Sequence, residues 1–104
     1  MWHKIRSLFS KEPGPNFKDM LAEGASLLDV RTDKEFQEDH LNQAIHIPLD
    51  ELDQRLTEVK SIKQPVIAYC RSGRRSGIAT KKLKAQGILT YNGGGLKELR
   101  SIIN

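Results

Sequence analysis

Short apolar runs alternate along this chain with longer segments in which apolar residues recur every three or four positions. The apolar runs cover residues 26–30, 44–47, 66–69 and 88–91. Their length and their content of branched and aromatic residues predict buried strands. The intervening and terminal segments predict amphipathic helices. Strands separated by helices predict an α/β domain, with a small parallel sheet of four to five strands and helices on both faces.

Local start and stop signals mark the ends of several helices. Asn16 is a predicted N-cap, and Gly24 is the predicted end of the helix that follows it. Thr32 and Glu35 match the capping box, in which a hydroxyl precedes a glutamate by three residues. The helix after the third strand is expected to run from about residue 75 to residue 86 and to stop at Gly87.

Three further segments have informative spacing. Four apolar residues predict one helix over residues 49–59, buried on one side: Leu49, Leu52, Leu56 and Val59. Gly77 is expected to let its helix approach a strand closely. The glycines at 93–95 are expected to form a tight turn that leads into a C-terminal helix.

Residues 1–15 are predicted to form an N-terminal appendage to a domain that spans residues 16–104. Four apolar residues of the appendage fall on one helical face: Trp2, Ile5, Leu8 and Phe9. The favoured interpretation is a short helix docked on the domain, or a frayed tail. The alternative is a basic amphipathic segment that contacts a membrane surface or a partner.

The composition is that of an ordinary globular domain. The chain has 104 residues, of which 38% are hydrophobic and 29% charged, enough for a modest core without metals or several disulfides. A single cysteine excludes an intramolecular disulfide and fits a reducing compartment. No apolar stretch approaches the length of a membrane span, and the first residues lack the pattern of a secretory signal. We therefore expect a cytoplasmic protein with no transmembrane segment.

The distribution of charged residues along the chain is more informative than the net charge of +4. Basic residues are interspersed with acidic ones rather than aligned along one element, so we expect no nucleic-acid partner. The densest basic cluster lies beside the single cysteine: Arg71, Arg74 and Arg75. A small bound anion explains this cluster more economically than a polyanion does.

Cys70 is the most informative residue for function. It follows the strand predicted at 66–69 and precedes a predicted helix, where backbone N–H groups have no intrahelical partner. If the loop curls, successive N–H groups form an anion-binding nest, with a hydroxyl from Ser72 and a backbone conformation at Gly73 that other residues avoid. These groups and the arginines favour the thiolate, which is the nucleophilic form of cysteine.

Three functions are open to such a loop. The thiolate can attack a sulfane sulfur and carry it as a persulfide, it can attack phosphorus or arsenic in an oxyanion, or the loop can bind an anion or a protein without reacting. Cysteine-dependent phosphatases place five residues between their cysteine and arginine, whereas four separate Cys70 from Arg75. Tyr69 also stands where those enzymes usually have histidine. A phosphatase or arsenate reductase is therefore disfavoured.

Polar residues outside the loop are predicted to be structural. Asp29 and Arg31 end a strand near the same edge, and an ion pair or turn contacts are favoured over catalysis. Glu35 is predicted to cap its helix, with a bridge to Arg31 as an additional contact. His40 and His46 have no cysteine or carboxylate partner at ligand spacing, so we expect no metal site.

Taken in order, these features resemble those of single-domain rhodaneses, the thiosulfate sulfurtransferase family. The resemblance spans about residues 16–104 and depends on an ordered set of landmarks: residues 28–31, 35–36, 40–41, 44–48 and 66–70, then Gly73, Arg75, Ser76, Leu83, Gly87 and the late glycines. Asp39 and Gln43 stand where the family usually has glycine. No tryptophan follows the late glycines within residues 97–99, where the family often has one.

The resemblance implies a rhodanese-like fold and an activity. Cys70 would take sulfur from thiosulfate, release sulfite and pass the persulfide sulfur to cyanide or a thiol. The substrate-binding loop would comprise Arg71, Ser72, Gly73, Arg74 and Arg75, with Arg75 the first choice among the arginines and Arg74 the second. Asp29 and Arg31 would support the loop.

The resemblance also implies partners. These are a thiosulfate-like anionic donor and a thiol or cyanide acceptor, with a sulfur-accepting protein as a further candidate; no cofactor or metal is implied. The alternative from a different class is a non-catalytic sulfur-carrier or protein-interaction module.

Overall fold

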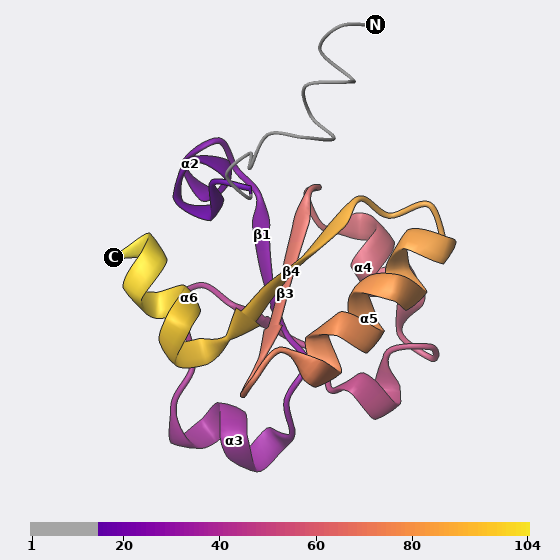
Figure 1. The fold of residues 1–104 in the computed structure, drawn as a ribbon. Helices are drawn as coiled ribbons and strands as arrows, with labels where there is room; N and C mark the ends of the chain where they lie inside the picture. Colours follow the sequence, from indigo (N-terminus) through magenta and orange to yellow (C-terminus); the bar gives the residue numbers. More distant parts are fainter. Residues whose placement is uncertain (1–14) are drawn as a thin grey trace, which may run out of the picture.

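A parallel four-stranded sheet forms the centre of the computed structural model, which describes residues 15–104 (Figure 1). The predictions for residues 1–14 lie outside the described residues. The strands are β1 (Ser26–Asp29), β2 (Ile45–His46), β3 (Val66–Cys70) and β4 (Thr90–Gly95), in the spatial order β2-β1-β3-β4. All neighbouring strands are parallel, as the alternation of strands and helices predicted.

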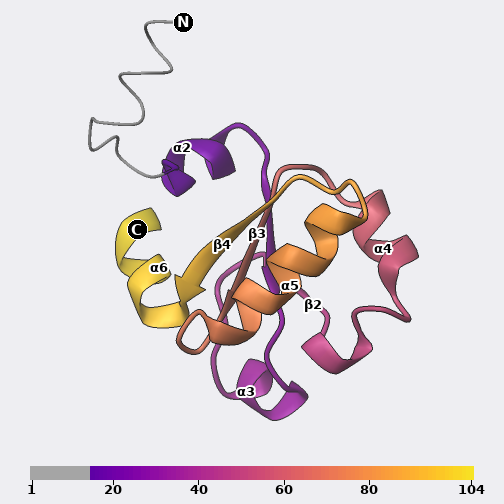
Figure 2. The ribbon, with the colours of Figure 1, turned by 45° about the vertical axis from the view of Figure 1, so that its right-hand side comes forward.

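Helices cover both faces of the sheet (Figures 1 and 2). One face carries α4 (Leu56–Ser61) and α5 (Arg74–Ala85), and the other carries α2 (Phe17–Ala22) and α6 (Leu96–Ile103). Strand β3 is buried along its whole length, with Val66 and Cys70 in the apolar cluster on the first face and Ile67 and Tyr69 in the cluster on the second. Alternate residues of one strand therefore contribute to two cores, as the pleat of a strand requires.

The predicted helix caps are present. The Asn16 side chain accepts a hydrogen bond from the Asp19 N–H at 3.0 Å at the start of α2. Thr32 and Glu35 form both hydrogen bonds of a capping box at the start of α3 (Asp33–Glu38). The longest described helix is α5, with 12 residues, and within residues 15–104 no helix has the length and apolar content needed to cross a membrane.

The prediction of one helix over residues 49–59 was wrong. The structure has a 3-10 helix, η1 (Leu49–Glu51), followed by turns and then the separate helix α4. Leu52 and Val59 are nevertheless both fully buried in one cluster. Spacing of three and four residues is met equally well by one long helix and by two short ones against the same core, so the pattern does not distinguish them.

The prediction of a tight turn at the late glycines was also wrong. Residues 93–95 belong to β4, which pairs with β3 through Cys70 opposite Gly95 and has a bulge near Ala68. A Cβ added to Gly93 would lie 2.8 Å from Ile67 Cγ2 and 3.0 Å from Leu99 Cδ2. The absence of a side chain here allows close packing between the strands and α6, rather than a change of chain direction.

Candidate active site

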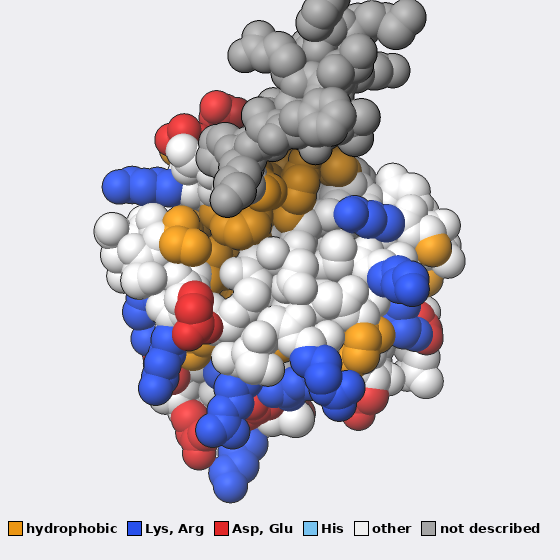
Figure 3. Space-filling model, in the orientation of Figure 1, with side chains coloured by type: hydrophobic (Ala, Val, Ile, Leu, Met, Phe, Trp, Pro, Cys, Tyr) orange, Lys and Arg blue, Asp and Glu red, His pale blue; other side chains and the backbone are white. Residues whose placement is uncertain are grey.

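Cys70 lies at the carboxyl edge of the sheet, as its place after the third strand predicted. It is the last residue of β3, next to Gly95 of β4, and Tyr69 before it is paired with Asp29 of β1. This is the edge where parallel α/β sheets bind ligands. Basic side chains, with some acidic ones, gather in Figure 3 over the end of the molecule where β3 leads into α5.

The loop after β3 surrounds the sulfur with hydrogen-bond donors. Cys70 Sγ accepts hydrogen bonds from the Gly73 N–H at 3.0 Å, the Ser76 N–H at 3.4 Å and the Ser76 hydroxyl at 3.3 Å. Gly73 adopts the left-handed backbone conformation, with φ of +97°, immediately before α5 begins. That conformation, which side chains disfavour, turns its N–H toward the sulfur.

Two opposing effects act on the acidity of Cys70. The residue is 1% exposed, and burial works to raise the pKa of its thiol. Hydrogen bonds from the Ser76 hydroxyl and N–H, with those of Ser72 and Gly73, outweigh burial, so the net effect lowers the pKa. The sequence predicted that loop N–H groups and arginines together favour the thiolate. In the structure, the hydrogen bonds of the loop are the causes that lower the pKa of Cys70.

Ser76 is the residue of this loop whose role the sequence did not reveal. It is the third residue of α5 and fully buried. Its hydroxyl also donates to Asn92 Oδ1 of β4 at 2.7 Å. The sequence did hold a signal for this role. Ser76 carries a hydroxyl in the first turn of a helix that starts beside a cysteine, and residues of the first turn lie near any group bound at the helix N-terminus.

Arg75 is held by an ion pair with Glu35 of α3. Two guanidinium nitrogens lie 2.7 and 2.9 Å from the two carboxylate oxygens. The expected bridge from Glu35 to Arg31 was wrong, because Arg31 is engaged elsewhere. The hydrogen bond to Glu35 is the main cause that raises the pKa of Arg75, and the charge of Cys70 also contributes. The ion pair with Glu35 therefore fixes the position of the Arg75 guanidinium at the start of the helix that follows the cysteine loop.

Asp29 and Arg31 form a buried ion pair, the role that the sequence analysis favoured over catalysis. Arg31 Nη2 lies 2.7 Å from Asp29 Oδ2, and the Arg31 backbone N–H donates to Asp29 Oδ1 at 2.9 Å. The same guanidinium donates to the carbonyl oxygen of Asp39. The pair joins the end of β1 to the segment after α3, beside the cysteine loop.

Residues 15–100 match the family model of the rhodanese-like domain. The chain belongs to the rhodanese-like family. Thiosulfate sulfurtransferase PspE of Escherichia coli (strain K12) is 39% identical over 74 residues, which cover 69% of this chain and 71% of PspE. The uncharacterized protein YqhL of Bacillus subtilis (strain 168) is 42% identical over 76 residues, which cover 71% of this chain and 60% of YqhL.

A solved structure agrees with these relatives. The structure of a rhodanese with anions from E. coli matches this chain with a TM-score of 0.64 and 38% identity, over 71% of this chain and 89% of that chain. The resemblance predicted from the ordered landmarks is confirmed, as is the α/β fold with a parallel sheet between helices. The protein is thus a member of the rhodanese-like sulfurtransferases.

The two departures from the usual rhodanese-like pattern have distinct consequences. Gln43 adopts the left-handed backbone conformation, with φ of 66°, at a position where the family usually has glycine. Asp39 instead forms a two-point ion pair with Arg100 of α6, at 2.8 and 2.9 Å. Gln43 thus retains a backbone shape suited to glycine, while Asp39 acquires a new contact between α6 and the segment after α3.

Arg71 and Arg74 occupy the rim of the rhodanese-like loop. Both are exposed, and neither forms a hydrogen bond or ion pair with another side chain within residues 15–104. Arg71 borders a hollow of about 450 Å³. Leu96 and Lys97 line the same hollow, on the segment where the family often has tryptophan. Acidic side chains, among them Glu38 and Glu98, line it as well, so the hollow beside the cysteine loop is mixed in charge.

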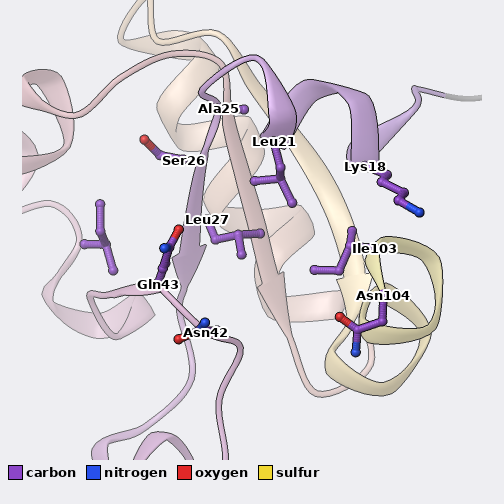
Figure 4. Close-up of a pocket in the computed structure, with 10 residues that line it drawn as sticks. Lys18, Leu21, Ala25, Ser26, Leu27, Asn42, Gln43, Ile103 and Asn104 are labelled. Carbon is purple, nitrogen blue, oxygen red and sulfur yellow. The ribbon is translucent and has the colours of Figure 1, made fainter.

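A second hollow lies away from the cysteine. Its volume is about 460 Å³, and its lining includes Lys18, Leu21, Leu27, Gln43 and Ile103 (Figure 4). Ala25 and Ser26, which also line it, are at the amino end of the sheet. No residue of the cysteine loop contributes to it, so the hollow is separate from the candidate active site.

The two histidines have structural roles, as predicted. The rings of His40 and His46 stack on Phe36, with centroid distances of 3.8 and 4.3 Å. One ring nitrogen of His46 also lies 2.8 Å from the Arg31 carbonyl oxygen. Among the described residues, no cluster of three or more His, Cys, Asp or Glu side chains is arranged to hold a metal ion.

Proposed function

We propose that this rhodanese-like protein transfers sulfane sulfur from thiosulfate, or a similar donor, to a thiol or cyanide through a persulfide on Cys70. The observation that carries the proposal is the group of donors around Cys70 Sγ: the Gly73 N–H, the Ser76 N–H and the Ser76 hydroxyl. They stabilise the thiolate that must attack and the anionic persulfide that follows. The similarity to PspE, named as a thiosulfate sulfurtransferase, supports this choice of donor.

The reaction has two balanced steps. In the first, the Cys70 thiolate attacks the outer sulfur of thiosulfate, a new S–S bond forms, and the old S–S bond breaks with its electron pair leaving on sulfite. In the second, a thiolate or cyanide attacks the outer persulfide sulfur, and Cys70 leaves as a thiolate. Cyanide becomes thiocyanate, and a thiol acceptor becomes a persulfide. No external oxidant or reductant is required, and the kinetics are ping-pong.

The arginines have different parts in this scheme. Arg75 is tied to Glu35 and holds a fixed positive charge near the sulfur. Arg71 and Arg74 are exposed at the rim, where they attract the dianionic donor and then sulfite. Ser72 and Gly73 contribute the backbone donors of the loop.

Mass spectrometry of the intact protein tests the proposal directly. After incubation with thiosulfate, the mass should rise by one sulfur atom, and cyanide should remove that atom as thiocyanate. The variant Cys70→Ser should show neither change, because Cys70 is the single cysteine. Sulfur uptake without release to cyanide or a thiol would identify a carrier rather than an enzyme. No uptake from thiosulfate by the wild type would refute thiosulfate as the donor.

A further inference from the structure

Asn92 links strand β4 to both ends of the first turn of α5. Its side-chain Nδ2 donates to the Gly73 carbonyl at 3.0 Å. Its Oδ1 accepts hydrogen bonds from the Gly94 N–H at 3.0 Å and from the Ser76 hydroxyl at 2.7 Å. Asn92 is exposed, yet its side-chain amide forms hydrogen bonds with three groups around the candidate active site.

These contacts determine how the amide is oriented. The Gly73 carbonyl can only accept and the Gly94 N–H can only donate, so the nitrogen must face Gly73 and the oxygen must face Gly94. The same oxygen therefore faces Ser76, and the Ser76 hydroxyl must supply the proton in that contact.

The Ser76 hydroxyl thus has two competing acceptors. Its oxygen lies 2.7 Å from Asn92 Oδ1 and 3.3 Å from Cys70 Sγ, but a hydroxyl has one proton to donate. While Cys70 is a thiol, its S–H can donate to the Ser76 oxygen and Ser76 to Asn92. Once the thiol proton is lost to solvent, the hydroxyl can turn to the thiolate, and the Gly94 N–H still satisfies Asn92.

We propose that Asn92 is a positioning residue for Cys70, which acts by competing for the Ser76 proton and by holding the Gly73 carbonyl. The inference depends on the proposed function only for its role in sulfur transfer. Gly77 provides the space that the contact needs, since a Cβ there would lie 3.2 Å from Asn92 Nδ2. The close approach predicted from Gly77 is therefore confirmed, and β4 is the strand that α5 approaches.

The variant Asn92→Asp tests this role without changing side-chain shape. A carboxylate accepts the Ser76 proton more strongly and cannot donate to Gly73. The measurement is the rate of Cys70 alkylation by iodoacetamide as a function of pH, with no background because Cys70 is the single cysteine. The midpoint should rise by about one pH unit in Asn92→Asp. The matched variant Asn42→Asp, at an exposed asparagine before β2, should leave it unchanged.

A double-mutant cycle separates the Ser76 route from a charge effect through space. Ser76→Ala alone should raise the alkylation midpoint, because the sulfur loses a donor. In the Ser76→Ala background, Asn92→Asp should add less than half of the rise it causes in the wild type. An equal rise in both backgrounds, or no rise in either, would overturn the inference. If Asn92→Asp does not fold, Asn92→Ala serves instead: removal of the competing acceptor should lower the midpoint where Ser76 is present, and this lowering should be absent in the Ser76→Ala background.

The alkylation measurement needs no sulfur donor, so its outcome is independent of the proposed function. If the wild type takes no sulfur from thiosulfate while the Asn92 variants behave as expected, the donor is wrong and the positioning role stands. If sulfur uptake occurs but the Asn92 variants titrate like the wild type, the sulfurtransferase stands and the positioning role fails.

Discussion

The guanidinium of Arg75 and the carboxylate of Glu35 form a two-point ion pair, with nitrogen–oxygen distances of 2.7 and 2.9 Å. Glu35 Oε1 also accepts the Thr32 N–H at 3.0 Å, so one carboxylate both caps α3 and anchors the helix that follows the cysteine loop. This pair joins α3 to the start of α5, and it gives Arg75 a fixed position beside the candidate active site.

We expect Glu35→Gln to destabilise the protein by about 1–2 kcal/mol at pH 7, since it removes a charged partner from both contacts. The hydrogen bond from Arg75 is the main cause that lowers the pKa of Glu35, to about 2. A carboxylate with a lowered pKa contributes stability that is fully present above its unfolded value of about 4.3 and is lost as the pH falls toward 2. Urea unfolding at several pH values measures the difference.

Glu38→Gln is the matched control for Glu35, because Glu38 is an exposed glutamate of the same helix. It should change the free energy of unfolding by less than about 0.5 kcal/mol. The free energies of unfolding of the wild type and Glu35→Gln should converge near pH 2. If their difference stayed the same there, the charge of the carboxylate would not be its source.

The lowered pKa of Cys70 predicts the pH dependence of sulfur uptake. Burial acts to raise this pKa, but the hydrogen bonds from Ser76, Ser72 and Gly73 outweigh it. The rate should therefore rise with pH through a midpoint below the ordinary cysteine value of about 8.5 and then reach a plateau. Single-turnover uptake from thiosulfate, measured by mass spectrometry, tests this; a midpoint at or above the ordinary value would contradict it.

We expect Arg71→Gln and Arg74→Gln each to raise the KM for thiosulfate by about two- to fivefold at low salt, with a smaller change in kcat. Both side chains are exposed at the rim of the loop, where they attract an anion before it reacts. High salt should reduce the effect, because it screens exposed charges. Steady-state assays at two ionic strengths measure both parameters.

Arg55→Gln removes the same charge from the N-cap position of α4, where Arg55 pairs with Glu51 and Glu58. Its KM for thiosulfate should match that of the wild type. If all three variants changed KM alike, net charge rather than the loop arginines would be responsible.

We expect Gln43→Gly to stabilise the protein by about 0.5–1 kcal/mol, because a residue with a Cβ is strained in the left-handed conformation. Gln43 has φ of 66° and is exposed. Thermal unfolding should show a higher midpoint. Gln37→Gly, at an exposed position inside α3, should instead destabilise by about 1 kcal/mol. Destabilisation by both substitutions would contradict the strain argument.

Local signals predicted much of the fold and the position of the cysteine. Thr32 and Glu35 are three residues apart and formed the expected capping box, and Cys70 follows directly from a run of buried residues. Such signals act within one helical turn or one strand. The error at residues 49–59 has the same origin, because local spacing does not report where a helix is interrupted.

Partners distant in the sequence required the fold. Arg31 lies only four residues from Glu35 in the sequence, but its guanidinium pairs with Asp29 instead. Glu35 therefore pairs with Arg75, 40 residues along the chain. Asn92 meets Ser76 because β4 lies beside β3 and α5.

The sequence by itself determined the order of the strands, the family and the place of the single cysteine after the third strand, since these follow from periodicity and from motifs of neighbouring residues. Only the tertiary structure decided which side chains stabilise Cys70 and which hold the loop. Those contacts depend on strand register at the carboxyl edge of the sheet and on how α5 packs against β4, and neither is encoded in the spacing of nearby residues.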